Sequence, residues 1–405
     1  MKIGIILRQA IISGGGERQA IMLAKELLSL GNQVAIYAAV FDREKCFPND
    51  NKGLKILTLP EAVAQGLESK INSASGLRRL SGENELALAL ANLIEPDTEV
   101  LNPNDNWGSH VVYFFKKRCS KTASVLMLND LDTARWSLFS DPVFGRKKNL
   151  LKWPIHYAKD IIERHYLKSQ NLIVVLNNRT VGLVKKYLNR EAIVVRTGVD
   201  LDRFRFIKHG APDLNRPIQL LSHGIFYVHR RYEDTIKALK ILRDRGLNVR
   251  LEIIGDYTHK SSAKEYFVRL ITLVSDLKLS DSVVFRGRVS DEELLKTYRE
   301  SHVFVSAAHM QTWGLAVFEA IGSGVPAAIS DTIGAAEVLR SGETAVIFKS
   351  IDPVSQAEAI ERLIKDKSLY ERVALNGFEF VKSNLSWRHY AKEMCGYFQM
   401  AAKRS

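Results

Sequence analysis

Short runs of apolar, mostly β-branched residues alternate along this chain with longer segments in which apolar residues recur every three or four positions. Residues 3–7 form the first such run, and they have the length of a buried strand. Ala20, Leu23 and Leu27 follow at helical spacing, and Gly31 stands where that helix should end, because glycine readily adopts the left-handed conformation found there. Further strands are predicted at residues 33–38, 99–101, 124–128, 172–176 and 193–195.

The same alternation restarts after residues 208–216, a turn-rich stretch that contains Gly210 and Pro212. In this second series, strands are predicted at residues 219–222, 249–254, 283–285, 303–305, 326–329 and 345–348. Strands that alternate with helices predict parallel sheets with helices on both faces. We therefore expect an α/β protein of two doubly wound, Rossmann-like domains, residues 1–195 and 196–385, that face each other across a cleft. Residues 386–405 form a last helical stretch, which we expect to cross back onto the first domain.

The composition is that of a globular protein, with 405 residues, 46% of them hydrophobic and 25% charged. Three widely spaced cysteines, Cys46, Cys119 and Cys395, form neither a disulfide framework nor a metal-binding pair, so we expect a reducing compartment. No apolar run reaches the ~18 residues that span a bilayer. The first apolar run is too short for the core of a signal peptide. We expect a cytoplasmic protein that is at most peripheral to a membrane.

The formal net charge of +13 changes this picture, since a basic protein suits an anionic partner. Residues 1–193 hold 27 Lys and Arg against 19 Asp and Glu. No zinc finger, aromatic–basic RNA motif or recognition helix accompanies the charge, so nucleic acid is not expected as a partner. Residues 146–168 combine seven basic residues with interleaved aliphatic and aromatic ones. Such a helix suits either peripheral contact with an anionic membrane or a solvated face on the domain.

Three consecutive glycines, Gly14, Gly15 and Gly16, follow the first predicted strand and precede the first predicted helix. Glycines let the backbone come close to a ligand, and a helix N-terminus offers free N–H groups, so a diphosphate site is predicted here. A tight strand-to-helix turn without a ligand is the alternative. The loop lacks the spacing of the dinucleotide-binding fingerprint.

A second candidate site lies in residues 311–326. Gly314 is placed where a loop after a strand turns into a helix, and Leu315 and Phe318 are spaced as on one helical face. Glu319 then lies one turn inside that helix, whose first N–H groups are unpaired. A carboxylate in this position can accept both hydroxyls of a ribose, although an incidental glutamate on a surface helix would show the same pattern.

Taken in order, these segments resemble the family-4 glycosyltransferases, which are retaining enzymes of the GT-B fold. The likeness covers nearly the whole chain. It includes residues 331–337 and 341–345, residues 197–204, which are similar to the family's N-G-V-D-x-x-x-F segment, and Ser386 with Trp387 before the last helix. A short likeness to mannosyltransferases of lipid-linked oligosaccharide assembly, at residues 14–17 and 39–47, favours GDP-mannose as the donor.

The resemblance assigns roles to single residues. The family's E-x(7)-E pair falls on Gln311 and Glu319, so Glu319 should bind the donor ribose and Gln311 should face the donor sugar without a negative charge. The family's glycine–arginine pair appears as Gly224 and Ile225, so one phosphate-binding arginine is missing. Arg230 or Arg231 stands near the position of the family's lysine and could clamp the diphosphate, or either could be a solvated surface residue.

The family's His-Asp element appears as Asn129 and Asp130, which suit an acceptor or donor-sugar contact, while Asp130 could instead cap the next helix. We interpret Asp130 and Asp132 as a chance D-x-D match, and no histidines have metal-ligand spacing, so neither a metal nor another cofactor is expected.

The sequence as a whole predicts a transferase that moves a hexose from a nucleotide diphosphate sugar to a glycan or lipid-linked glycan acceptor. A GT-B-fold nucleotide-sugar epimerase is one alternative, because it would use the same donor site. A non-catalytic nucleotide-sugar-binding partner of another transferase is the other, because Gln311, Ile225 and Asn129 depart from the family pattern.

Overall fold

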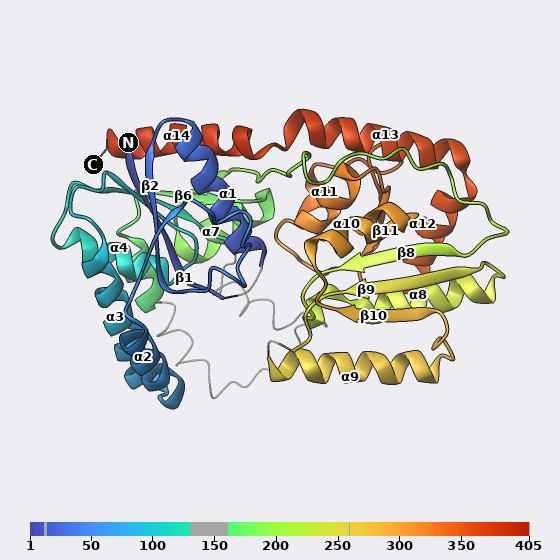
Figure 1. Cartoon of the computed structure of the whole chain (residues 1–405), viewed down its shortest axis with the longest axis horizontal. Helices are drawn as coiled ribbons and strands as arrows, with labels where there is room; N and C mark the ends of the chain where they lie inside the picture. Colours follow the sequence, from blue (N-terminus) through green and yellow to red (C-terminus); the bar gives the residue numbers. More distant parts are fainter. Residues whose placement is uncertain (12–13, 130–160, 259, 405) are drawn as a thin grey trace. The chain divides into compact units, whose positions relative to one another are not determined.

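The computed structural model describes residues 1–11, 14–129, 161–258 and 260–404. The described chain divides into two compact units. The first contains the residues up to Thr197 together with those from Trp387 onward, and the second contains Gly198–Ser386. Each unit is a parallel sheet with helices packed on it (Figure 1).

The first unit is built on a seven-stranded parallel sheet in the order β3-β2-β1-β4-β5-β6-β7. Its strands are β1 (Lys2–Ala10), β2 (Gln33–Phe41), β3 (Lys55–Thr58), β4 (Val100–Pro103), β5 (Ala123–Met127), β6 (Leu172–Val175) and β7 (Ile193–Val194). Six of these strands are predicted by the apolar runs. The sequence analysis missed β3, because this short edge strand is nowhere fully buried and therefore carries no apolar run.

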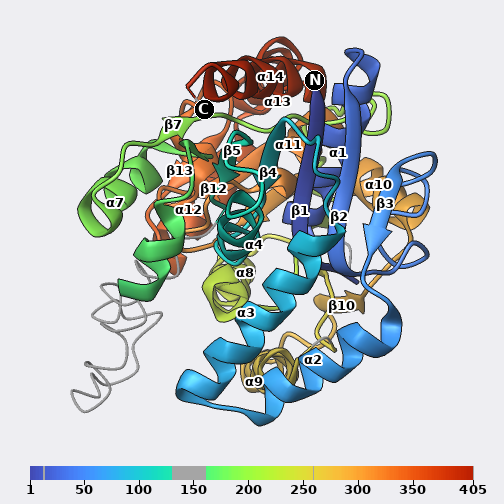
Figure 2. The same ribbon diagram turned by 90° about the vertical axis from the view of Figure 1, so that its left-hand side faces the viewer.

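Helices cover both faces of this sheet, and Figure 2 shows α2 and α3 as a helical hairpin. The helices with described bounds are α1 (Gly15–Ser29), α2 (Glu61–Ser73), α3 (Gly76–Leu93), α4 (Gly108–Lys116), α7 (Asn178–Leu188) and α14 (Trp387–Ala402). On α1, the predicted apolar face with Ala20, Leu23 and Leu27 is buried. Gly31 follows this helix with φ +83, so the predicted glycine stop is confirmed.

The C-terminal helix α14 packs on α1 and β5 of the first unit. Tyr390, Met394 and Phe398 are buried at helical spacing, and each such side chain contributes roughly 1.5–3 kcal/mol when fully removed from water. Gln19 Nε2 on α1 donates a hydrogen bond to Tyr390 Oη over 2.9 Å. Because the amide and the phenol satisfy each other, α14 can bury a polar tip there.

The second unit has a six-stranded parallel sheet in the order β10-β9-β8-β11-β12-β13. Its strands are β8 (Ile218–His223), β9 (Val249–Ile254), β10 (Val283–Gly287), β11 (Val303–Ser306), β12 (Ala327–Ser330) and β13 (Val346–Phe348), and all six are predicted. Its helices are η3 (Val228–Arg230), α8 (Tyr232–Asp244), α9 (Ser261–Asp276), α10 (Asp291–Glu300), α11 (Leu315–Gly322), η4 (Gly334–Glu337), α12 (Pro353–Lys365) and α13 (Lys367–Asn384).

Each sheet reverses its strand order beside its first strand, between β1 and β4 in the first unit and between β8 and β11 in the second. In open sheets of this kind, ligands bind outside the carboxyl ends of the strands at such a switch point. The fold therefore positions two candidate sites, one in each unit. The predicted class, two doubly wound parallel sheets, is confirmed.

Candidate functional site

The loop after β8 brings a guanidinium group against the backbone of the second unit. Gly224 has φ +153, and a Cβ added there would lie 3.1 Å from Arg230 Cζ. Tyr232 Oη donates a hydrogen bond to the Gly224 carbonyl over 2.7 Å, which holds the loop in this path. Glycine is favoured here because L side chains rarely adopt this φ, and a Cβ would also crowd Arg230.

The two neighbouring arginines that the sequence left as alternatives have different surroundings. Arg231 Nε and Nη2 each donate to a carboxylate oxygen of Asp234 over 2.8 Å, and Arg231 Nη1 lies 2.7 Å from Glu233. Arg230 makes no ion pair with any residue that the structure describes, and its buried Nε has no hydrogen-bond partner among them. Arg231 is therefore neutralised within its own helix, whereas the charge of Arg230 is available to an anion.

The loop after β11 is fixed to the loops on either side of it. The main-chain N–H of His309 donates to the His229 carbonyl over 2.7 Å, and His309 Nδ1 lies 2.8 Å from Ser350 Oγ. The main-chain N–H of Gly334 donates to the Gln311 carbonyl over 2.8 Å. Gln311 itself is half-buried in this loop. These bonds hold Arg230 and Gln311 on adjoining loops.

Helix α11 begins with an open N-terminus. Its preceding residue, Gly314, has φ +101 and offers no side-chain cap, and a Cβ there would lie 2.7 Å from Ile333 Cδ1. Of the other helices in this unit, α10 has a capping box of Ser290 and Glu293 and α12 is capped by the Asp352 carboxylate, whereas α8 and α9 also have no side-chain cap. The first turn of α11, which includes the half-buried Leu315, therefore offers its N–H groups and positive pole to a ligand.

Glu319 lies one turn inside α11, at the place in the helix that the sequence predicts. The residue is only 6% exposed, and Tyr298 Oη donates a long hydrogen bond of 3.4 Å to Glu319 Oε2. The same phenol lies 3.3 Å from His223 Nδ1 at the end of β8. The sequence analysis did not identify Tyr298 or His223 as site residues. For His223, its position directly before Gly224 was a signal that could have indicated a role, whereas Tyr298 had no such signal.

In the first unit, the glycine loop is occupied by a carboxylate. Gly14 precedes α1, and a Cβ added to Gly14 would clash with Glu17 Oε2, so the Glu17 carboxylate lies directly over this glycine. Burial raises the pKa of Glu17, and the main-chain N–H of Glu17 opposes that rise. The N-terminal pole of α1 thus already faces an acid. Gly15 is exposed to solvent and Gly16 is partly exposed, so a ligand could reach the backbone here. A diphosphate bound there would be repelled by the carboxylate of Glu17, which has the same sign of charge.

Asn129 lies at the carboxyl ends of three strands of the first sheet. Its Nδ2 donates to the Asn104 carbonyl over 3.2 Å, and a Cβ on Gly16 would lie 3.7 Å from the same nitrogen. The structure thus brings Asn129 beside the glycine loop. Asp130 lies outside the described residues. Sequence reasoning missed Asp105, which follows β4 and whose Oδ1 accepts the Gly108 N–H over 2.6 Å.

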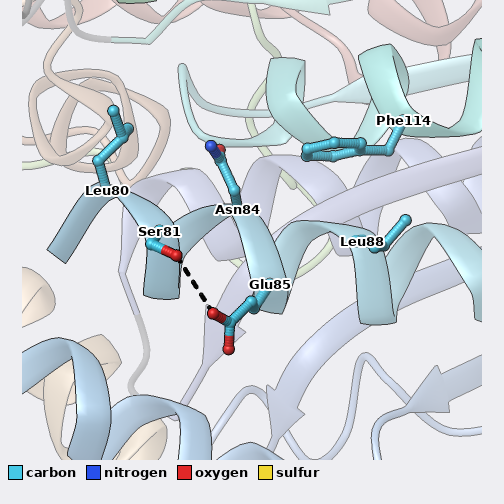
Figure 3. Close-up of a pocket in the computed structure, with 6 residues that line it drawn as sticks. All are labelled: Leu80, Ser81, Asn84, Glu85, Leu88 and Phe114. Atoms are coloured by element: carbon cyan, nitrogen blue, oxygen red, sulfur yellow. Dashed lines mark hydrogen bonds between the residues drawn. The ribbon is translucent and has the colours of Figure 1, made fainter. Parts of the chain in front are cut away.

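A surface hollow of about 440 Å³ lies on α3 and α4, and its lining is Leu80, Ser81, Asn84, Glu85, Leu88 and Phe114 (Figure 3). Ser81 Oγ donates to Glu85 Oε1 over 3.2 Å, so the polar residues on this wall are partly paired. None of the predicted site residues lines this hollow.

Two further expectations concern the surface of the chain. Most of residues 146–168, for which a membrane contact and a solvated helix face are the two alternatives, lies outside the described part. Within the described residues, no helix combines the length and apolar character needed to cross a bilayer. The same residues contain no group of three or more His, Cys, Asp or Glu arranged to hold a metal ion.

Comparison with known proteins gives a family for the second unit. Residues 205–380 match the family model "Glycosyl transferases group 1". The chain is 27% identical over 213 residues to the capsular polysaccharide biosynthesis glycosyltransferase CapM of Staphylococcus aureus, covering 51% of this chain and 54% of that protein. It is 24% identical over 176 residues to the mannosylfructose-phosphate synthase of Agrobacterium fabrum, covering 43% and 39%. The matched part thus spans about half or less of these relatives' lengths.

Solved structures share the fold over the full chain. Sucrose-phosphate synthase from Thermosynechococcus elongatus superposes with a TM-score of 0.78 at 17% identity, covering 100% of this chain and 99% of the other. Anabaena HepE, solved in complex with UDP-glucose, superposes with a TM-score of 0.74 at 14% identity, covering 99% and 100%. Residues 205–380 therefore match the glycosyl transferases group 1 model, and the chain as a whole has the GT-B fold.

Proposed function

We propose that this chain is a hexosyltransferase that binds a nucleotide diphosphate sugar at the switch point of its second unit and passes the sugar to a carbohydrate acceptor. The observation that carries this proposal is the pairing of two unused positive groups on adjoining loops. Arg230 has no ion pair among the described residues, and the N-terminus of α11 has no side-chain cap. Together they suit a diphosphate, which needs a cation and main-chain N–H donors.

The rest of the site fits a nucleotide sugar around that diphosphate. Glu319 is buried one turn into α11, where its carboxylate can accept hydrogen bonds from two ribose hydroxyls. Tyr298 donates to this carboxylate and can hold it in position. Gln311 precedes α11 and carries a neutral amide, which can both donate and accept hydrogen bonds at the donor sugar.

In this proposal, catalysis depends mainly on the leaving diphosphate. Negative charge develops on it as the bond to the sugar breaks, and Arg230 with the N-terminus of α11 stabilises that charge without rearranging. The resemblance to family 4 implies that the sugar keeps its anomeric configuration. Because these groups supply the positive charge, we expect the reaction to need neither a metal nor another cofactor.

Chelation tests that expectation. Activity should persist after treatment with excess EDTA, measured as transfer from a nucleotide sugar. Complete loss with EDTA and recovery with Mg²⁺ or Mn²⁺ would contradict the metal-independent mechanism.

The donor and acceptor are proposed by class. CapM supports a glycan as the acceptor, because its name places it in polysaccharide biosynthesis. A lipid-linked glycan and a membrane contact at residues 146–168 remain predictions of the sequence. HepE was solved with UDP-glucose, whereas the short mannosyltransferase likeness favours GDP-mannose. A thermal-shift panel of UDP, GDP, ADP and their hexose conjugates would select among these donors.

Release of nucleoside diphosphate from each donor, with and without a mixture of glycan acceptors, tests the activity. A transferase releases it in proportion to the acceptor that is glycosylated. A nucleotide-sugar epimerase converts the donor without releasing diphosphate, and a non-catalytic binding partner shifts the thermal midpoint without turnover. Either of the last two results would replace the proposed activity.

A further inference from the structure

The carboxyl edge of the first sheet gathers acidic and amide side chains. Glu17 lies over Gly14 at the end of β1, and Asp105 follows β4. The two carboxylates are near enough for the charge of Asp105 to raise the pKa of Glu17, after the larger effect of burial. Asn129, after β5, donates to the Asn104 carbonyl over 3.2 Å. Three polar side chains, one from the segment after each of three strands, thus lie at one switch point.

The loop after β4 also contains polar atoms that the described residues leave without partners. Asn104 is 4% exposed and Trp107 is 9% exposed. Asn104 Oδ1 and Trp107 Nε1 are buried and have no hydrogen-bond partner in the part of the chain that the structure describes. Buried polar atoms are normally paired, so one acceptor and one donor here remain available to a polar ligand.

Among the described residues, Arg8, whose charge acts on Asp105, is paired with other acids. Arg8 at the end of β1 lies 2.8 Å from Glu83 and 3.3 Å from Glu68, and its guanidinium lies 5.6 Å from the centre of the Trp107 ring. Arg18, next to Glu17, lies over the Phe47 ring at 4.6 Å. Burial raises the pKa of Asp105, and the hydrogen bond from the Gly108 N–H and the charge of Arg8 oppose that rise. A ligand that adds negative charge would therefore increase the cost of keeping these acids buried.

We infer that this edge binds the acceptor, and that the acceptor sugar held there is uncharged, rich in hydroxyl groups and free of phosphate. The inference rests on the proposed transferase activity. Hydroxyls of a sugar can donate hydrogen bonds to Glu17 and Asp105. These bonds offset the free-energy cost of removing water from the two carboxylates. The amides and the indole N–H of Trp107 then supply the complementary donors and acceptors. A phosphate monoester is largely dianionic at neutral pH and would meet two carboxylates.

Saturation-transfer NMR on the full chain, with matched sugar pairs, tests this inference. The neutral probes are methyl α-D-glucopyranoside, methyl α-D-mannopyranoside and myo-inositol, and their counterparts are glucose 6-phosphate, mannose 6-phosphate and myo-inositol 1-phosphate. We expect at least one neutral probe to bind, and its phosphorylated counterpart to bind at least about tenfold more weakly because of charge repulsion.

Two isosteric substitutions locate the binding. Glu17→Gln and Asp105→Asn should each weaken the neutral probe roughly tenfold or more, the loss expected for a charge-assisted hydrogen bond. Asp105→Asn keeps an oxygen that can accept the Gly108 N–H, and circular dichroism checks that each variant is folded. Glu26→Gln is the matched control, because Glu26 lies on the same helix away from the glycine loop.

The result that overturns the inference is binding of a phosphorylated probe as tightly as its neutral counterpart, or no binding of any neutral probe. Unchanged neutral-probe affinity in both Glu17→Gln and Asp105→Asn would equally overturn it. A parallel thermal-shift titration with nucleoside diphosphates reports on the second unit alone. If the full chain binds a neutral sugar but no nucleoside diphosphate, the proposed transferase activity is rejected and the sugar site in the first unit is retained.

Discussion

At the switch point of the first sheet, β1 leads to Glu17 in the first turn of α1, and β4 leads to Asn104 and Asp105. In the second sheet, β8 leads to Arg230 and β11 leads to the open N-terminus of α11. The strand order around the two points is the same. Helix α1 after β1 and helix α11 after β11 each begin directly after a glycine, yet a carboxylate covers the N-terminal pole of α1 and no side chain caps that of α11. The comparison teaches that topology selects where a ligand binds, while a few loop side chains select its charge.

The largest expected effect is a difference between substitutions of Arg230 and Arg231, two adjacent arginines of the second unit. Arg230→Ala should lower kcat about 100- to 1,000-fold, since it removes a preorganised donor to the leaving group, while the thermal midpoint stays near that of the parent. Arg231→Ala should instead destabilise the fold by roughly 3 kcal/mol, because the buried Asp234 loses its partner. Steady-state kinetics and urea unfolding of both variants measure this. Equal kinetic losses in two equally stable variants would contradict the distinction.

Glu319→Ala should weaken binding of the nucleoside diphosphate about 10- to 150-fold, the equivalent of a charge-assisted hydrogen bond. Isothermal calorimetry on the full chain measures the affinity. Glu337→Ala is a control in the same unit, because Glu337 is exposed in η4. If the nucleotide binds Glu319→Ala as tightly as the parent, the donor site does not lie at the switch point of the second sheet.

A smaller effect is expected at Gln311. Gln311→Ala should lower kcat about 2- to 12-fold with little change in nucleotide affinity, because a neutral hydrogen bond to the donor sugar is lost. Gln311→Glu restores the acid of the family pattern and tests whether the neutral amide suits this donor. A rise in kcat would show that the native residue weakens catalysis, and a fall would show that the donor sugar needs the amide N–H. No change in either variant would place residue 311 outside the donor-sugar pocket.

The smallest effect concerns the stability of the first unit. Burial raises the pKa of Glu17, so its contribution to stability is complete below the pKa of the unfolded chain and is lost as pH rises through the folded value. Glu17→Gln should therefore raise the thermal midpoint slightly at pH 7, relative to the parent, and leave it unchanged near pH 4. Glu26→Gln, on the same helix, should show no such difference. A destabilised Glu17→Gln at pH 7 would mean that the carboxylate is favourably held in the absence of a ligand.

Local pattern was sufficient for most of the fold. Apolar runs and helical spacing predicted β1, β5 and the buried face of α1, because burial in a parallel sheet or against it favours an apolar run or a regular apolar stripe. The same pattern placed Glu319 inside α11 behind Gly314, since the spacing of three and four residues is a property of the helix alone. The sequence analysis missed β3, because this edge strand is not fully buried and its residues do not form an apolar run.

Charge state and pairing depended on the tertiary structure. Arg230 and Arg231 are equivalent in sequence, and only the turn at η3, with Arg231 at φ +54, directs one side chain to Asp234 and leaves the other beside Gly224. Likewise Glu17 and Asp105 are far apart in the chain, and the pairing of β1 with β4 brings them to one edge. Whether a charge is free to bind a ligand depends on neighbours within a few ångströms, and for these residues the fold supplies those neighbours.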